Sequence, residues 1–110
     1  MEGLELIAFQ IISAVGTARS SYIEAIQCAK QGRFEEAERL ITDGDEMFNE
    51  GHKAHASLLQ EDAEGKDTVC LLILHAEDQL MSAEGFKTIA IEFMDLYSRL
   101  DHATKQEMIG

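Results

Sequence analysis

Hydrophobic positions recur at spacings of three and four residues along most of this chain, which is the pattern of amphipathic helices. Short polar segments that contain glycine separate three such stretches. We expect helices over residues 4–30, 34–59 and 68–100. Short connections between long helices favour an antiparallel, up-down-up bundle. The predicted fold class is therefore all-α, with one domain over residues 1–110 and a polar, frayed tail at 101–110.

The polar segments carry recognisable helix-end signals. Gly32 is placed to end the first helix, and Asp67 is placed to cap the start of the third. Gly16 stands in the middle of the first helix, where glycine costs about 1 kcal/mol relative to alanine. We interpret Gly16 as a point where a neighbouring helix approaches closely.

Charge and composition narrow the class of partner. The formal net charge is −12, so the protein lacks the positive field that draws in nucleic acid or an anionic membrane. Basic proteins or metal ions are better matched. No run approaches the roughly 18 apolar residues of a membrane span, and no basic signal-peptide head is present. We expect a cytoplasmic protein without membrane insertion, in which Cys28 and Cys70 are reduced and buried.

The third helix is apolar around its whole circumference at residues 71–74, which read Leu-Leu-Ile-Leu. A helix that is hydrophobic all round is buried all round. Three helices cannot surround one of their own number, so the sequence predicts a homo-oligomer that covers the remaining face.

A polar cluster follows within the same helix. His75, Asp78, Gln79 and Ser82 stand at positions i, i+3, i+4 and i+7, which lie on one side of a helix. An imidazole that titrates near neutral pH is able to accept a phosphoryl group and pass it on. If the oligomer has a threefold axis, three copies of Asp78 converge there, and their repulsion requires a cation, shared protons or nearby donors.

Simpler interpretations remain open for the histidines at this point. Taken alone, His75 is also consistent with a partly buried histidine that is hydrogen-bonded to a neighbour. His52 and His55 form an i, i+3 pair without the Glu-x-x-His motif of a di-metal centre, so a structural or surface role is expected for His55. His102 falls in the tail. The chain has no glycine-rich phosphate loop, so ATP is not the expected phosphoryl donor.

Taken together, the motifs resemble those of one known family over essentially the whole chain. The segment HAEDQLM, from His75 to Met81, is similar to the active-site segment of the lactose/cellobiose-type enzyme IIA of the bacterial sugar phosphotransferase system. Three further segments resemble the same family: GTARS (16–20), AKQGRFEEAERLI (29–41) and EGHKAHASLL (50–59).

The resemblance implies a homotrimer of three-helix subunits. It implies that His75 accepts a phosphoryl group from the phosphocarrier protein HPr and passes it to the cognate enzyme IIB during uptake of a β-linked disaccharide. It also implies that Asp78 from each of three subunits binds a divalent cation, typically Mg²⁺, at the trimer axis. Gln79 stands where members often have histidine, and it retains only the ability to hydrogen-bond a phosphoryl oxygen. Arg33 stands where an aspartate helix cap is common.

Two other classes of protein compete with this interpretation. A histidine phosphotransfer domain of two-component signalling typically has a lysine three residues after its histidine, where this chain has Asp78. A non-catalytic adaptor is suggested by the segment 29–40, which resembles a tetratricopeptide-type hairpin, but no 34-residue repeat is present. The identity of the sugar, the phosphorylated nitrogen, the cation and the roles of His52 and His55 stay open.

Overall fold

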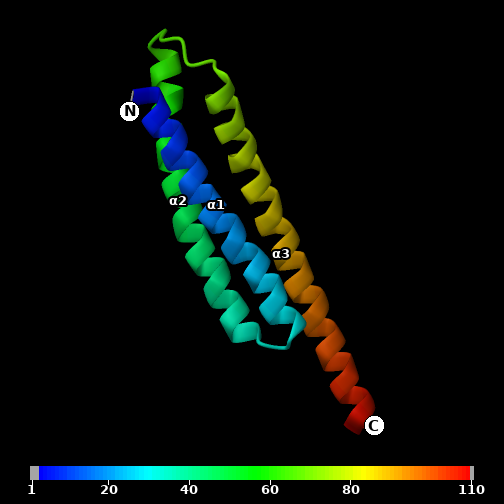
Figure 1. The fold of residues 1–110 in the computed structure, drawn as a ribbon. Helices are drawn as coiled ribbons and strands as arrows, with labels where there is room; N and C mark the ends of the chain where they lie inside the picture. The colour runs from blue at the N-terminus through cyan, green and yellow to red at the C-terminus, as the bar shows by residue number, and fades with distance from the viewer. Residues whose placement is uncertain (1–2, 110) are drawn as a thin grey trace.

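The computed structural model describes residues 3–109, which form three α-helices and no strand (Figure 1). These are α1 (Gly3–Lys30), α2 (Phe34–Ala63) and α3 (Leu71–Ile109). α1 and α3 run in one direction and α2 runs in the other, so the predicted all-α, up-down-up bundle is confirmed. The molecule is a rod of 66 × 18 × 17 Å because α3 continues past the turn between α1 and α2.

Glycine ends the first two helices. Gly32 and Gly65 both have left-handed backbone angles, with φ of +80° and +82°. The N–H of Gly32 donates to the Ala29 carbonyl at 3.0 Å, and the N–H of Arg33 donates to the Cys28 carbonyl at 2.9 Å. This pair of bonds satisfies carbonyls that the end of α1 would otherwise leave unpaired. The role predicted for Gly32 is confirmed.

The start of α3 differs from the prediction. The helix begins at Leu71, so Asp67 does not cap it. The Asp67 carboxylate instead accepts the backbone N–H of Val69 at 3.2 Å, and the Thr68 hydroxyl donates to Asp62 on α2 at 3.1 Å. These local bonds stabilise a turn, and β-branched residues such as Thr68 and Val69 lose side-chain freedom in a helix.

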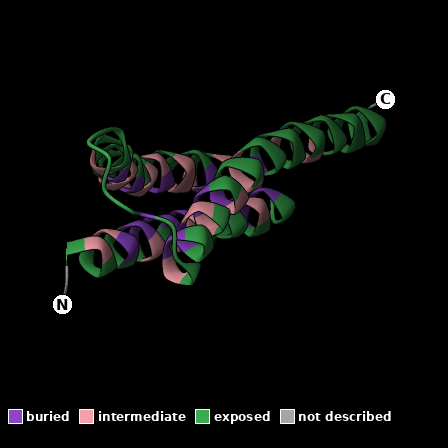
Figure 2. Cartoon of the chain, turned by 90° about the horizontal axis from the view of Figure 1, so that it is seen from above, coloured by how far each residue is buried: buried purple, intermediate pink, exposed green. Residues whose placement is uncertain are grey.

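Two helices are longer than the prediction. α2 continues to Ala63, and the tail is helical over residues 101–109 rather than frayed; position 110 lies outside the described residues. No glycine or proline interrupts this part of α3, and Asp101 pairs with Lys105 one turn later at 3.0 Å. Figure 2 shows that this extension is almost entirely exposed.

α1 packs against both other helices and carries most of the core. Its buried face is rich in alanine, which allows the neighbouring backbones to approach. The buried residues of α1 are Ala8, Ile11, Ala14, Val15, Ala18, Tyr22, Ala25, Cys28 and Ala29. None of the helices within residues 3–109 combines the length and apolarity needed to cross a bilayer.

The close approach expected at Gly16 occurs at other glycines. A Cβ added to Gly51 would lie 2.5 Å from Val15 Cγ1, and one added to Gly44 would lie 2.6 Å from Tyr22 Cε1. A Cβ added to Gly16 meets no atom within 4 Å in the described chain. The prediction for Gly16 is wrong within the subunit, because the glycines that admit the neighbouring helix belong to α2.

One polar contact joins all three helices. The buried Tyr22 hydroxyl of α1 donates to Asp45 Oδ1 of α2 at 2.7 Å, and Lys87 Nζ of α3 lies 3.0 Å from the same oxygen. Burial raises the pKa of Tyr22 above its ordinary value, and the hydrogen bond and negative charge of Asp45 add to the effect. This contact links the three helices at one level of the bundle.

We expect Tyr22→Phe to lower the free energy of unfolding by about 1 kcal/mol, because Asp45 loses a buried hydrogen-bond donor. The raised pKa also predicts that native stability falls as pH rises above about 10, where the unfolded tyrosine ionises first. Urea unfolding at pH 7 and above pH 10 measures both effects. The control is Tyr97→Phe, and an alkaline loss that is equal in native protein and Tyr22→Phe would contradict the assignment.

Candidate functional site

α3 has two faces with different roles. The face that packs on the bundle consists of Ile73, Ala76, Leu80, Ala83 and Ala90, all buried. The opposite side occupies about a third of the helix circumference at 100° per residue, and we call it the outer face. The outer face carries Leu71, Leu74, His75, Asp78, Met81, Ser82, Ile89, Phe93, Leu96 and Leu100.

The outer face is apolar and uncovered in the single chain. Leu71 exposes 83% of its surface, Leu74 54% and Met81 70%. Further along, a shallow groove is lined by Ile89, Phe93 and Leu96, among others. Within residues 71–74 of one chain, Ile73 is buried and Leu72 packs against the core, whereas Leu71 and Leu74 are exposed. Burial of this run on all sides therefore stays a prediction about the oligomer. A continuous apolar stripe of this kind typically marks an interaction surface.

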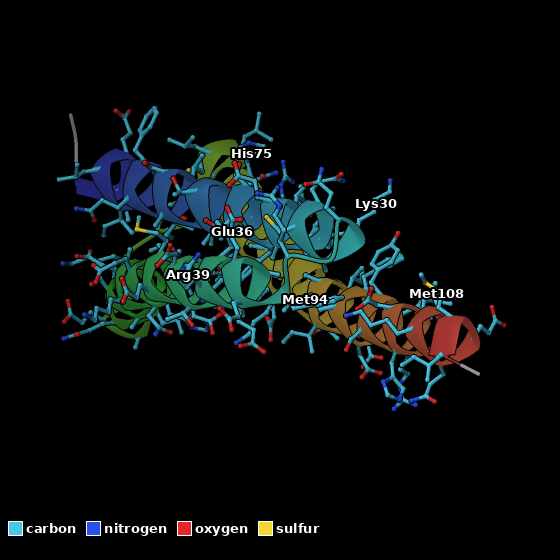
Figure 3. All side chains as sticks on the ribbon, turned by 90° about the horizontal axis from the view of Figure 1, so that it is seen from below. Lys30, Glu36, Arg39, His75, Met94 and Met108 are labelled. Atoms are coloured by element: carbon cyan, nitrogen blue, oxygen red, sulfur yellow. The ribbon has the colours of Figure 1, made fainter. Side chains whose placement is uncertain are left out.

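The two residues of greatest chemical interest lie within this stripe. His75 and Asp78 are both exposed on the outer face, and Figure 3 shows His75 on the part of α3 that runs beside the N-terminal half of α1. Neither side chain has a hydrogen-bond or ion-pair partner among residues 3–109. The imidazole of His75 is therefore free to react with a molecule that approaches from solvent.

Gln79 and Ser82 lie on the side of this cluster nearer to α1, and both are partly buried. The Ser82 hydroxyl accepts a hydrogen bond from an Arg19 guanidinium nitrogen of α1 at 3.3 Å. The same guanidinium lies over the Phe86 ring, 5.8 Å from its centroid. Sequence reasoning did not identify Arg19, because its contacts with Ser82 and Phe86 depend on how α1 packs along α3.

The other three histidines contact other side chains or lie far from His75. His55 Nε2 on α2 lies 3.1 Å from a Glu77 carboxylate oxygen on α3, so its expected structural role is confirmed. His52 is exposed and packs edge-on against Phe48, with ring centroids 4.7 Å apart. His102 is exposed on the extension of α3.

The two cysteines differ from each other. Cys28 is buried in α1, as predicted, but Cys70 is exposed. The prediction for Cys70 is wrong because the residue precedes the first turn of α3 instead of lying within the helix, and only its carbonyl accepts a helical bond, from Leu74.

Within residues 3–109 of one chain, no three or more His, Cys, Asp or Glu side chains gather closely enough to hold a metal ion. Asp78 offers one exposed carboxylate, and carboxylate oxygens are the ligands that hard cations such as Mg²⁺ prefer. A single carboxylate gives a weak cation site, so a tightly held ion at Asp78 would require further carboxylates from other copies of the chain.

Comparisons with known proteins agree with one another. The sequence profile of the family described as "PTS system, Lactose/Cellobiose specific IIA subunit" matches residues 6–98. The lichenan-specific phosphotransferase enzyme IIA component of Bacillus subtilis (strain 168) is 41% identical over 100 residues, which covers 90% of this chain and 91% of the relative.

Solved structures give the same result. The cellobiose-specific enzyme IIA from Bacillus anthracis superposes with a TM-score of 0.89 and 42% identity, over 93% of this chain and 94% of that chain. The chitobiose IIA of Escherichia coli, solved in complex with HPr, superposes with a TM-score of 0.80 and 32% identity, over 92% of this chain and 99% of that chain.

Proposed function

Because the chain belongs to the lactose/cellobiose-specific IIA family of the sugar phosphotransferase system, we propose that His75 carries a phosphoryl group between two protein partners during sugar uptake. The single observation that carries the assignment to His75 is its exposed imidazole on the outer face of α3, beside Asp78 and without a competing partner within the described residues. The other three histidines are paired, packed against an aromatic ring or remote from this face.

The chemistry requires little of the protein beyond positioning and charge stabilisation. The lone pair of an imidazole nitrogen attacks phosphorus while the bond from phosphorus to the donor protein breaks. The reverse exchange then delivers the group to the acceptor, so no oxidant or cofactor is consumed. Gln79, one turn after His75, is placed to donate an amide hydrogen bond to a phosphoryl oxygen.

HPr is the proposed donor and a cognate enzyme IIB the proposed acceptor. The solved complex of the chitobiose IIA with HPr supports the first assignment. The proposed cargo of the pathway is a β-linked disaccharide of the lactose, cellobiose or chitobiose class, and the proposed location is the cytoplasm. The relatives named for lichenan, cellobiose and chitobiose support this class.

We further propose that the chain assembles as a homotrimer through the outer face of α3. The uncovered apolar side chains of that face lose contact with water on assembly, at about 25 cal/mol per Å² of apolar surface. A threefold axis along this face also brings the copies of Asp78 together, since each chain presents the residue on the same stripe. His75 is rotated by about 60° from Asp78 toward α1, so it lies at the edge of the proposed interface and stays accessible.

A divalent cation such as Mg²⁺ fits three converging carboxylates, because it neutralises their repulsion. We expect Asp78→Leu to keep the trimer, since the substitution removes both the charge and the need for the cation. Metal analysis of the trimer after gel filtration in Mg²⁺ measures the effect. A native trimer without bound cation, or a variant that retains it, would contradict this part of the proposal.

The function is tested by incubation of the protein with enzyme I, HPr and phosphoenolpyruvate, followed by intact mass measurement. We expect one added phosphoryl group per chain, and its loss when enzyme IIB is added. If the native protein gains no mass while the chitobiose IIA gains one group in the same mixture, the phosphocarrier assignment is wrong.

A further inference from the structure

Arg19 differs from the other cationic residues in how it is held. Of the nine Lys and Arg residues, six form ion pairs with carboxylates inside the described chain. Arg19, Lys30 and Arg39 do not, and of these only Arg19 is partly buried. Packing on Phe86 and a hydrogen bond to Ser82 hold its guanidinium, and neither contact neutralises its charge. In a chain with net charge −12, an uncompensated guanidinium remains available for an additional anion.

The position of Arg19 relates it to His75. Ser82 and Phe86 continue the row of α3 that begins at His75 and includes Gln79, with the spacing i, i+4, i+7 and i+11. Because α1 runs parallel to α3 and helical side chains lean toward their N-terminus, the Arg19 side chain is directed toward the end of the row that carries His75.

The surface of α1 next to Arg19 has free space at Gly16. Gly16, one turn before Arg19, places no side chain there, and a Cβ added to it would meet no atom within 4 Å. Seven residues separate His75 from Ser82, which is about 10 Å along the helix axis at 1.5 Å per residue. That spacing is about one Debye length at 0.1 M ionic strength, so an effect of the Arg19 charge at His75 should grow as the salt concentration is lowered.

The stretch of α3 around His75 supplies no positive charge of its own. Residues 71–86 contain no Lys or Arg but include Glu77, Asp78 and Glu84. A phosphoryl group brings about two further negative charges into this acidic surface. Among the hydrogen bonds, ion pairs and ring contacts of the described residues, Arg19 is the one Lys or Arg that reaches this stretch.

We propose that Arg19, held by Ser82 and Phe86, is the cation that stabilises the phosphoryl group carried by His75. This inference rests on the proposed phosphocarrier function. Arg19 remains protonated throughout and exchanges no atom with the phosphoryl group. Its positive charge lowers the free energy of the phosphorylated protein relative to the free protein. The protein therefore takes a larger share of the phosphoryl groups from HPr.

The test measures the equilibrium of phosphoryl groups between HPr and this protein, by intact mass of both proteins in one mixture. Arg19→Met removes the charge but keeps an unbranched side chain against Phe86, and Arg19→Gln is a second neutral variant that is still able to hydrogen-bond Ser82. Arg19→Lys keeps the positive charge but replaces the planar guanidinium with a compact ammonium group. Arg39→Met is the matched control, because it removes an equal charge from an exposed site on α2. Circular dichroism identifies variants that remain folded.

We expect both neutral Arg19 variants to shift the equilibrium toward HPr by roughly fivefold to tenfold, from the Coulomb energy of a dianion and a cation at this separation. Arg19→Lys should recover most of the shift, and Arg39→Met should resemble the native protein. Equal values for the neutral Arg19 variants and Arg39→Met would overturn the role of Arg19, as would a failure of lysine to restore the equilibrium. Absence of phosphorylation in the native protein would instead overturn the proposed function on which the inference depends.

Discussion

Replacement of His75 by alanine is expected to abolish phosphorylation of the protein, so that the intact mass after incubation with phosphorylated HPr equals that of the untreated chain. The variant should remain folded, because His75 is exposed on α3 and contacts no partner within the described residues. Alanine also favours the helix slightly more than histidine. The variant should therefore lose phosphoryl transfer, while the midpoint of its thermal unfolding stays nearly unchanged.

Alanine substitutions at the other histidines provide matched controls. His52→Ala and His102→Ala should be phosphorylated at the native level. His55→Ala loses the contact with Glu77 and should lower stability modestly while retaining the phosphoryl group. Phosphorylation of His75→Ala at the native level would contradict the assignment, because another side chain would then be the nucleophile.

Replacement of Ile89 by glutamate is expected to dissociate the proposed trimer into monomers. Ile89 lies in the middle of the outer face, with 47% of its surface exposed in the single chain. Assembly would bury a charge from every copy against apolar neighbours, at roughly 3–5 kcal/mol for each uncompensated charge. Light scattering should change from three times the 12.2 kDa chain mass to that mass itself.

Ile91→Glu is the control for this experiment. Ile91 is almost equally exposed, at 45%, but two residues of helix rotate it by about 200°, away from the outer face. This variant should remain trimeric. A native protein that is monomeric at micromolar concentration, or an equal effect of both substitutions, would contradict the assembly through α3.

The helices could be predicted from the sequence because their signals are local. Hydrophobic residues spaced three and four apart located all three helices. Gly32 located the first turn, where it adopts a left-handed backbone conformation. The start of α3 could not be placed, because Asp67 is equally suited to a turn and to a helix cap, and its bond to Val69 decides between them. The tail was misjudged because a polar helix without a packing partner has no apolar stripe. The ion pair between Asp101 and Lys105 and the lack of glycine support it instead.

The part of the candidate site that lies on one helix could be predicted from the sequence. His75, Asp78, Gln79 and Ser82 share a face by spacing alone, and α3 is continuous through all four. The contribution of Arg19 could not be predicted, because it depends on the position of α1 along α3, which contacts between helices determine. The contact of His55 with Glu77 is missed for the same reason.

The most direct measurement of the central claim is the location of the phosphoryl group in the native chain. Phosphorylated protein is digested under neutral to alkaline conditions, and the modified peptide is sequenced by tandem mass spectrometry. The account predicts one modified peptide that contains residues 71–81, with the phosphoryl group on His75. A group found on His52, His55, His102 or a hydroxyl side chain, with His75 unmodified, would contradict it.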